Sequence, residues 1–213
     1  ADFLFGPRIP KEKIMILHNA LDISRYTYDE QKREEVRRKL NVSDKYVIGN
    51  VGRMSYQKNH KFLVDCFYEV QKKDKNALLL LLGDGYLEGD IRNQVMQYGI
   101  ENKVIFAGAV DNVEDYLQAM DVFVFPTLFE GLPNALVEAQ AAGLKCLCSD
   151  QITKEVGITD HIRFLALDKS QWIDAILNDR DGYSRKKVDE QIRNAGYDIR
   201  CEIKNLEEIY LDS

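Results

Sequence analysis

The fold is decided by residues 46–85, YVIGNVGRMSYQKNHKFLVDCFYEVQKKDKNALLLLLGDG. Short apolar runs lie at its two ends, Tyr46 to Val51 and Ala77 to Leu82, and these predict buried strands. Between them, His60 to Lys73 carries apolar side chains at helical spacing, which predicts an amphipathic helix. A strand, a helix and a second strand in this order predict two parallel strands joined by a helical crossover.

The same alternation continues along the chain. Further apolar runs predict strands at Lys103 to Phe106, Asp121 to Phe125, Lys145 to Cys148 and Arg163 to Leu167. Helical spacing predicts helices at Leu87 to Tyr98, Val113 to Met120 and Asn134 to Ala142, and again from Ser170 to the end. We therefore expect an α/β fold, with a Rossmann-like doubly wound parallel sheet over residues 14–195 that begins at strand Ile14 to Leu17. Residues 1–13 are typical of a linker, and residues 196–213 predict a C-terminal helix.

The composition is that of an ordinary folded domain and argues against several classes of function. The chain has 213 residues and a formal net charge of −6 without a block of Lys and Arg, which argues against nucleic-acid binding. Its longest apolar runs are far too short to span a bilayer. The 4 cysteines lack paired spacing and predict buried reduced thiols, with a metal site as the remote alternative. The chain begins at Ala1 without a signal pattern, which predicts a piece of a longer cytoplasmic polypeptide.

Features suited to a ligand follow four of the predicted strands. The carboxyl ends of parallel strands lie on one edge of a sheet, and doubly wound folds bind ligands in the crevice outside that edge. Gly52 and Arg53 follow the first of these strands, Gly83 the second and Gly108 the third, while residues 126–130 follow the fourth. The sequence therefore predicts that these four loops line one crevice.

Arg53 and Lys58 are two cations in a loop between a strand and a helix. The planar Arg guanidinium can donate two hydrogen bonds to a phosphate, and the Lys ammonium adds a positive charge. The neighbouring glycine lets the backbone approach the ligand closely, so this loop suits a phosphate-bearing ligand. The alternative is an exposed loop with two solvated side chains, and the two interpretations are evenly balanced on this feature alone.

The turn Gly83-Asp84-Gly85 follows a strong strand and invites comparison with a dinucleotide fingerprint. The next glycine is Gly89, one place too late for G-x-G-x-x-G, so that match fails. We expect a tight turn whose second glycine leaves room for a ligand or a helix start.

Glu130 and Glu138 lie in FEGLPNALVEAQAAG (129–143). Pro133 or Asn134 is expected to open a helix that ends at the last glycine, which places Glu130 in the loop and Glu138 one turn inside the helix. The unpaired N–H groups and positive dipole end of that helix start predict an anion site facing the two cations. Carboxylates beside such a site accept hydrogen bonds from hydroxyls and would repel phosphate, so the pattern favours a nucleotide sugar.

Four stretches together carry a resemblance to a known family: ILHNALD (16–22), VGRMSYQKNHKFL (51–63), LLGDGYLEGDI (81–91) and VIFAGAVDNVEDYLQAMDVFVFPTLFEGLPNALVEAQAAGLKCLCSD (104–150). The chain resembles the C-terminal, donor-binding half of GT-B glycosyltransferases of the retaining family 4 (group 1), and is most similar to bacterial exopolysaccharide and capsule members. The glutamate pair is specific because D-x-F-x-x-P precedes it and E-A-x-A-x-G follows it. Two positions depart from the family pattern: Ala20 replaces the glycine of N-G-x-D, and Asn59, expected to cap the next helix, replaces a frequent glycine.

The resemblance implies a role for each matching position. Arg53 and Lys58 are similar to the pair that grips the diphosphate, and Glu130 to the residue that orients the transferred sugar, so these three are the predicted catalytic residues. Glu138 is similar to the glutamate that holds the ribose hydroxyls. The other predicted donor-binding positions are Gly52, Gly83, Gly108, Ala109, Val110, Gly131, Leu132 and Asn134. The resemblance implies no metal and no other cofactor.

For the whole protein, the resemblance implies transfer of a sugar with retention in bacterial surface polysaccharide biosynthesis. The donor would be a nucleotide diphosphate sugar, with a UDP-sugar favoured, and the acceptor a glycan or a lipid-linked sugar. Acceptor groups would come from an N-terminal half outside this chain, toward which the helix at 196–213 is expected to pack. The chain alone is therefore expected to bind donor and to be inactive in transfer. We expect a cytoplasmic protein, and peripheral association with the inner face of the membrane stays open.

Other functions remain as alternatives. A GT-B sugar-nucleotide epimerase is the nearest enzyme, and a non-catalytic interaction domain is the alternative from another class. The failed glycine spacing disfavours a dinucleotide-dependent oxidoreductase. Asp179-Arg180-Asp181 has the D-x-D form of a manganese motif, but it falls in a polar connection between helices, so we do not expect it to bind metal.

Overall fold

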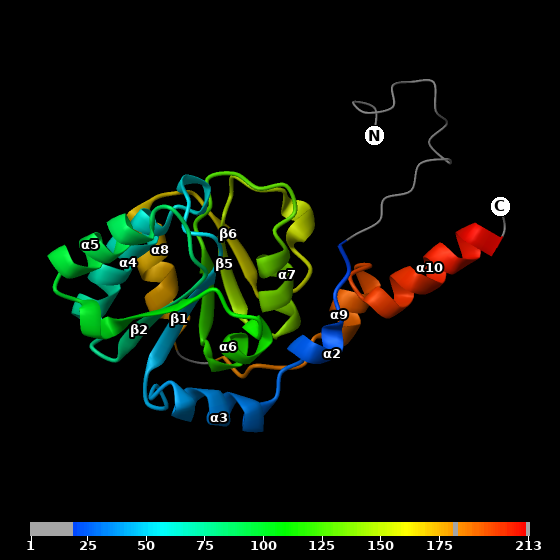
Figure 1. Cartoon of the computed structure of the whole chain (residues 1–213), viewed down its shortest axis with the longest axis horizontal. Helices are drawn as coiled ribbons and strands as arrows, with labels where there is room; N and C mark the ends of the chain where they lie inside the picture. The colour runs from blue at the N-terminus through cyan, green and yellow to red at the C-terminus, as the bar shows by residue number, and fades with distance from the viewer. Residues whose placement is uncertain (1–18, 181–182, 212–213) are drawn as a thin grey trace, which may run out of the picture.

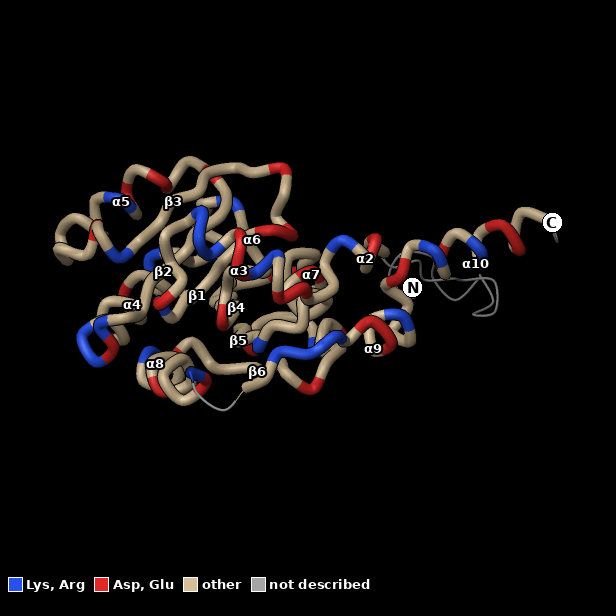
Figure 2. The backbone as a smooth tube through the Cα atoms, turned by 90° about the horizontal axis from the view of Figure 1, so that it is seen from below, with Lys and Arg blue, Asp and Glu red and all other residues tan. Residues whose placement is uncertain are grey.

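The computed structural model describes residues 19–180 and 183–211, and its centre is a six-stranded parallel sheet. The strands are β1 (Tyr46–Val51), β2 (Ala77–Leu82), β3 (Val104–Gly108), β4 (Val122–Phe125), β5 (Lys145–Ser149) and β6 (Ile162–Leu165). Their order is β3-β2-β1-β4-β5-β6; Figure 1 labels β1, β2, β5 and β6, and Figure 2 labels β3 and β4 as well. The chain winds outward from β1 to β3 and then returns beside β1 to wind the other way, so the predicted doubly wound sheet is confirmed. The predicted linker 1–13 and the predicted strand Ile14 to Leu17 lie outside the described residues.

Helices cover both faces of this sheet because successive residues of each buried strand point to opposite sides. One core packs the strands against α2 (Ile23–Tyr26), α6 (Val113–Ala119), α7 (Asn134–Ala141) and α9 (Asp189–Asn194). The other packs them against α4 (His60–Lys73), α5 (Glu88–Gln97) and α8 (Lys169–Asn178). Each buried aliphatic or aromatic side chain contributes about 1.5–3 kcal/mol of hydrophobic free energy, so these two cores hold the sheet between the helical layers.

The cysteines follow the same alternation. Cys146 and Cys148 belong to one core and Leu147 to the other, so the two thiols point to the same face of the sheet. All 4 cysteines are free thiols, and burial raises the pKa of the Cys66 and Cys148 thiols to about 12. Cys201 is only half-buried, so the expectation of burial is wrong for this residue.

The predicted strands and helices from β1 to the start of α8 appear with boundaries shifted by one or two residues at most. The helical pattern predicted from Ser170 onward is divided into α8, α9 and α10, and the helix predicted to begin at residue 196 begins at Ile199. In the described part of the chain, short 3-10 turns join these elements: η3 (Tyr56–Lys58), η4 (Glu101–Lys103) and η5 (Lys154–Val156). Helix α3 (Glu30–Lys39) was not predicted. It begins where the Asp29 carboxylate accepts a hydrogen bond from the backbone N–H of Lys32 at 3.0 Å. Val36 and Arg37 are its buried residues, so it has no apolar stripe that periodicity could detect.

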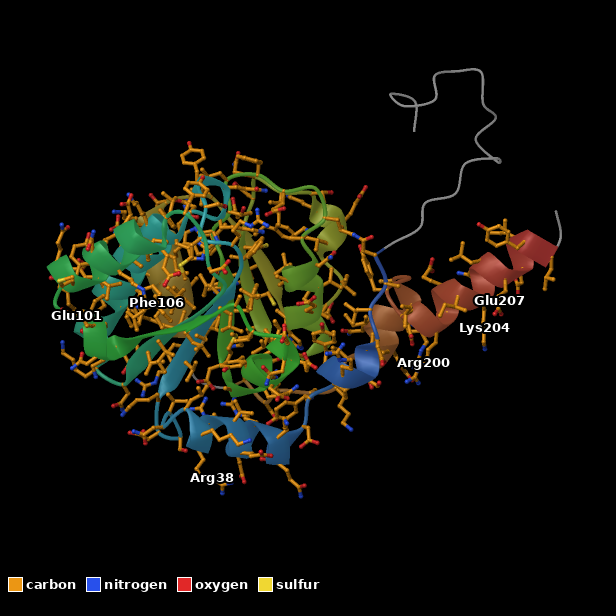
Figure 3. All side chains as sticks on the ribbon, in the orientation of Figure 1. Arg38, Glu101, Phe106, Arg200, Lys204 and Glu207 are labelled. Carbon is orange, nitrogen blue, oxygen red and sulfur yellow. The ribbon has the colours of Figure 1, made fainter. Side chains whose placement is uncertain are left out.

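The end of the chain folds back on its beginning before it leaves the domain. Leu21 forms a parallel bridge with Asp198, and its N–H donates to the carbonyl of Tyr197 at 2.9 Å. Helix α10 (Ile199–Leu211) follows, and none of its residues is buried. It extends away from the sheet, with Arg200, Lys204 and Glu207 along its length (Figures 1 and 3).

Acidic and basic residues are interspersed along the helices (Figure 2). Within residues 19–180 and 183–211, the structure contains no helix with the length and apolar character needed to cross a membrane.

Candidate functional site

The loops that follow β1, β2 and β3 meet at the carboxyl edge of the sheet, as predicted. The N–H of Gly83 donates to the carbonyl of Gly108 at 2.7 Å, and the N–H of Met54 donates to the carbonyl of Asp84 at 2.6 Å. These backbone bonds join the first loop to the second and the second to the third. Backbone bonds therefore hold these three loops together at the carboxyl edge of the sheet.

Two glycines make this close approach of the loops feasible. Gly83 has φ +119°, and a Cβ there would lie 2.3 Å from the carbonyl oxygen of Gly52. Gly85 has φ +154°, and a Cβ there would lie 2.4 Å from the carbonyl oxygen of Met54. The expectation that Gly85 leaves room for a ligand or a helix start is corrected: the backbone of the neighbouring loop occupies that space.

The loop after β1 is also joined to the loop after β4. The side-chain amide of Gln57 donates to the carbonyl of Phe129 at 2.8 Å, and the N–H of Leu128 donates to the carbonyl of Gln57 at 2.8 Å. The buried hydroxyl of Thr127 donates to the same Gln57 carbonyl at 2.9 Å. These bonds place Lys58, the next residue, beside Glu130.

Lys58 and Glu130 form an ion pair at this junction. Their side chains are only 18% and 14% exposed, so water screens the pair less than it would a surface pair. The Lys58 ammonium also lies 4.7 Å from the ring centroid of Phe125, the last residue of β4. Gly52 lies beneath the Lys58 stem, since a Cβ at Gly52 would contact the lysine Cδ at 3.3 Å.

Among the described residues, the Arg53 side chain, unlike that of Lys58, has no ion-pair partner. Its side chain is exposed, and within residues 19–180 and 183–211 no hydrogen bond or ion pair involves its guanidinium. Arg53 therefore offers an exposed guanidinium in the same loop as the partly buried Lys58–Glu130 pair, and its planar fork suits an oxyanion.

Helix α7 begins at Asn134 after Pro133, as predicted from the proline. Within the described chain, Leu136 is the first residue of α7 whose backbone N–H donates to a backbone acceptor, the carbonyl of Pro133 at 3.0 Å. The N–H groups before it, including that of the exposed Asn134, are available at the positive end of the helix. A Cβ at Gly131 would meet nothing within 4 Å, so the approach to this helix start is open.

Glu138 lies in the second turn of α7 and is half-buried. Burial raises the pKa of its carboxyl above the ordinary 4.5. The nearby hydroxyl of Tyr26, from α2, opposes that rise in the pKa. Burial, followed by the nearby charge of Glu138, raises the pKa of Tyr26 to about 12, so the phenol stays protonated at neutral pH.

The segment Gly108 to Val110 lies between β3 and α6. Gly108 has φ +72° with open space at its Cβ position, Ala109 is exposed, and Val110 packs against the core. Leu132 is half-buried against the same core. The structure therefore places the predicted donor-binding residues in the loops at one edge of the sheet, while the role of each stays a prediction.

Asn59 follows Lys58 in a conformation that the sequence did not indicate. Its φ of 56° is left-handed, which explains why glycine suits this position. Its side-chain amide donates to the carbonyl of Pro126 at 3.1 Å and makes no capping bond to α4, so the expected cap is wrong.

The D-x-D stretch also has a structural explanation at the residues that are described. Asp179 ends α8, and its carboxylate accepts from Lys145 and Arg163 at 3.4 and 2.9 Å. Arg180 pairs with the buried Asp74 at 2.9 Å. Asp181 lies outside the described residues. In the described part of the chain, no group of three or more His, Cys, Asp or Glu side chains is placed to hold a metal ion.

Sequence reasoning missed the residues that surround Glu138 on its other side. Tyr26 of α2 and Glu114 of α6 are near enough to shift the pKa of Glu138, and Arg25 pairs with Glu114 at 2.5 Å. These three residues are distant in sequence from Glu138, and no local pattern links them to it.

A doubly wound α/β sheet with cations, an open helix start and two carboxylates around its carboxyl edge is typical of α/β domains that bind a ligand at that edge. Residues 45–178 match the family model for glycosyl transferases group 1, and the chain belongs to that family.

The curated relatives include EpsF of Bacillus subtilis (strain 168), which is 32% identical over 98% of this chain and 56% of its own length. The capsular polysaccharide biosynthesis glycosyltransferase CapM of Staphylococcus aureus is 33% identical over 58% of this chain and 32% of its own length. The chain thus spans about half, or less, of the length of the relatives it matches.

Among solved structures, Anabaena Alr3699/HepE in complex with UDP and glucose superposes with a TM-score of 0.77. The match covers 96% of this chain and 58% of that one at 17% identity, so it establishes the shared fold.

Proposed function

We propose that this chain is the donor-binding half of a glycosyltransferase that transfers a hexose, with retention, from a nucleotide diphosphate sugar. The observation that carries the proposal is the Lys58–Glu130 ion pair, held between the loops after β1 and β4 beside the start of α7. A cation and a carboxylate held together there, with the free Arg53 guanidinium in the same loop as Lys58, provide separate partners for a diphosphate and a sugar.

The diphosphate would bind between Arg53, Lys58 and the start of α7. To do so it must compete with Glu130 for the Lys58 ammonium. A diphosphate carries more negative charge than one carboxylate, and it gains the Arg53 fork and the helix N–H groups as well. Glu130, released from Lys58, would then accept hydrogen bonds from hydroxyls of the sugar to be transferred.

The nucleoside would lie along the other side of α7. Glu138 would accept from the ribose hydroxyls, and the backbone from Gly108 to Val110 would contact the base. We favour UDP as the nucleotide, a preference that the UDP-bound Anabaena neighbour supports by its fold. Gly52, Gly83, Gly131, Leu132 and Asn134 would contribute backbone contacts and room.

The two glutamates do not form the acid and nucleophile or base pair of a glycosidase in this proposal. Glu130 is paired with a cation, and Glu138 is half-buried in the second turn of α7, so neither is presented as an acid to a leaving oxygen. Arg53, Lys58 and the helix start would instead stabilise the departing diphosphate, a contribution worth roughly 3–4 kcal/mol per well-placed donor. The acceptor hydroxyl would attack on the face that the diphosphate leaves, and a diphosphate oxygen would take its proton.

The remaining parts of the reaction belong to the longer protein that we propose. An N-terminal half would supply the acceptor site, and the apolar side chains of α10, including Ile203 at 48% exposed, would pack toward it. The acceptor would be a glycan or a lipid-linked sugar in bacterial surface polysaccharide synthesis, which the CapM relative supports. We place the protein in the cytoplasm, with peripheral contact at the inner face of the membrane.

Calorimetry with a panel of uridine, guanosine and adenosine diphosphates in EDTA tests the proposal. We expect binding without metal, with UDP tightest, and no transfer by the chain alone. Arg53→Ala and Lys58→Ala should each weaken binding by roughly tenfold to hundredfold, the loss expected for a charge-assisted hydrogen bond. Lys61→Ala is the matched control, because Lys61 pairs with Asp90 on the exposed side of α4.

Absence of binding of all three diphosphates would contradict the site. Turnover of a nucleotide sugar by the full-length protein without any acceptor would favour the epimerase. An unchanged affinity in both Arg53→Ala and Lys58→Ala would exclude these two residues from the diphosphate site.

A further inference from the structure

Three consecutive side chains between β1 and α4 bond the loop that follows β4. Each of them reaches a different residue of that loop. The bonds are those of the Gln57 amide to the Phe129 carbonyl at 2.8 Å, the Lys58 ammonium to Glu130, and the Asn59 amide to the Pro126 carbonyl at 3.1 Å. The loop after β4 is therefore held along its length, from residue 126 to residue 130, by residues 57–59.

The loop that carries Glu130 depends on these bonds for its position. Residues 126–133 belong to no helix or strand, and Phe129 is 55% exposed. Among the described residues, the hydrogen bonds that join residues 128–130 to another part of the fold all come from residues 57–58. The place of the Glu130 carboxylate is therefore set by the loop before α4.

Asn59 offers its amide to this loop from an uncommon backbone conformation. Its φ of 56° lies in the left-handed region, where the residue ends η3 and begins α4. Glycine adopts this conformation without strain, and asparagine tolerates it better than most other residues do. The Asn59 side chain makes no bond to its own helix and donates to Pro126 instead. The bond to Pro126 is therefore what asparagine adds at a position whose backbone suits glycine.

The two amides differ from the Lys58 ammonium in what a diphosphate does to them. In the proposed function, the diphosphate takes the Lys58 ammonium and breaks its bond to Glu130. The amides of Gln57 and Asn59 are uncharged and bond backbone carbonyls, so a diphosphate does not compete for them in the same way. Their bonds remain to hold the loop when the ion pair is lost.

We propose that Gln57 and Asn59 are positioning residues for the transferred sugar: their amides keep Glu130 in place after Lys58 has turned to the diphosphate. The inference rests on the proposed function, because it takes Lys58 as a diphosphate contact and Glu130 as the sugar contact. It deepens that function by distinguishing the residue that changes partner from the two residues that keep the sugar site in shape.

Calorimetry in EDTA with UDP and with the UDP-sugars of glucose, galactose and N-acetylglucosamine tests the inference. The quantity compared is the sugar ratio, which is the affinity for a UDP-sugar divided by the affinity for UDP. It is followed for the UDP-sugar that has the highest ratio in the parent chain. The division cancels any change at the diphosphate site, because both ligands share that change. Glu130→Gln should lower the ratio, because Glu130 is the proposed sugar contact.

Two variants remove the amides one at a time. Gln57→Leu keeps the approximate size of the side chain, and Asn59→Gly keeps the left-handed backbone and so tests the inference even if Gln57→Leu does not fold. Each should lower the sugar ratio by about fivefold, the value of one neutral hydrogen bond, without lowering the affinity for UDP. Adding Gln57→Leu to Glu130→Gln should change the ratio little, because both residues act through one contact.

Gln94→Leu is the matched control. Its side-chain amide donates to the carbonyl of Lys61 at 3.1 Å between α5 and α4, so the variant removes the same kind of bond without touching the loop after β4. It should leave the sugar ratio unchanged.

Equal losses of affinity for UDP and for the UDP-sugar in Gln57→Leu and Asn59→Gly would overturn the inference, because a merely structural role predicts that result. If Glu130→Gln lowers the ratio while both amide variants keep the ratio of the parent, the proposed function stands and this inference fails. A ratio that Glu130→Gln leaves unchanged would refute Glu130 as the sugar contact, and the inference would fail with it. If the parent binds none of the ligands, the proposed function and the inference both fail.

Discussion

His60 makes the stability of the fold depend on pH in a direction that the structure fixes. The imidazole is 2% exposed at the start of α4, and neither ring nitrogen has a hydrogen-bond partner within the described residues. Burial, with the charge of Lys58 as the second cause, lowers the pKa of His60 from 6.5 to about 4. The folded state therefore resists protonation at a pH where the unfolded chain takes up a proton.

The sign and size of the effect follow from these two pKa values. Above pH 7 both states are neutral at this residue, and the stability is unaffected. As the pH falls below 6.5, the unfolded chain gains a proton that the folded chain does not, so the free energy of unfolding decreases. Between pH 7 and pH 5 the loss is about 2 kcal/mol, at about 1.36 kcal/mol per pKa unit.

Urea unfolding followed by the fluorescence of Trp172 measures this loss, because Trp172 is the single tryptophan and is fully buried. The parent should lose about 2 kcal/mol more than His60→Leu between pH 7 and pH 5. Val64→Ala, at a buried neighbour in α4, should destabilise the protein by an amount that does not change with pH. Parallel pH profiles for the parent and His60→Leu would refute the reasoning.

Three further results are expected. Gly83→Ala should destabilise the protein by about 2 kcal/mol or more, because its Cβ would clash with the Gly52 carbonyl and its φ is positive. Gly89→Ala, which has open space around its Cβ in helix α5, should stabilise the protein by about 0.5–1 kcal/mol. Urea unfolding that ranks the two variants in the opposite order would contradict the loop packing. The UDP affinity of the parent should fall as the pH is lowered through the raised pKa of Glu138, because the neutral acid accepts fewer hydrogen bonds. Calorimetry should show that this pH dependence of the UDP affinity is absent in Glu138→Gln. Tyr46→Phe should lose about 1 kcal/mol of stability, because the buried hydroxyl donates to a carbonyl of α8 at 2.7 Å; a variant as stable as the parent would exclude that bond as a contributor.

The sequence predicted the elements around the sheet well because their signal is local. The apolar runs at Ala77 to Leu82 and the helical spacing of His60 to Lys73 carry their own period, and both elements have the predicted boundaries. The proline before Asn134 likewise predicted the start of α7. Helix α3 was not predicted because its buried side chains are too few to form an apolar stripe at helical spacing.

The candidate site was predictable only as a collection of loops. The rule that parallel strands end at one edge predicts Arg53, Lys58 and Glu130 at the same edge of the sheet, and the Lys58–Glu130 pair agrees with it. The left-handed Asn59 and the proximity of Tyr26 and Glu114 to Glu138, which shifts its pKa, could not be predicted. Both features depend on residues that are distant in sequence and close only in the folded chain. No local sequence pattern indicates which residues those are.

The central claim is that Lys58 exchanges Glu130 for the donor diphosphate at the start of α7. A crystal structure of the chain with UDP, grown without divalent metal, tests it most directly. The account predicts the diphosphate between Arg53, Lys58 and the first N–H groups of α7, the ribose on Glu138, and the Lys58–Glu130 pair broken. UDP bound elsewhere on the molecule, or UDP bound in this crevice with the Lys58–Glu130 pair intact, would contradict it.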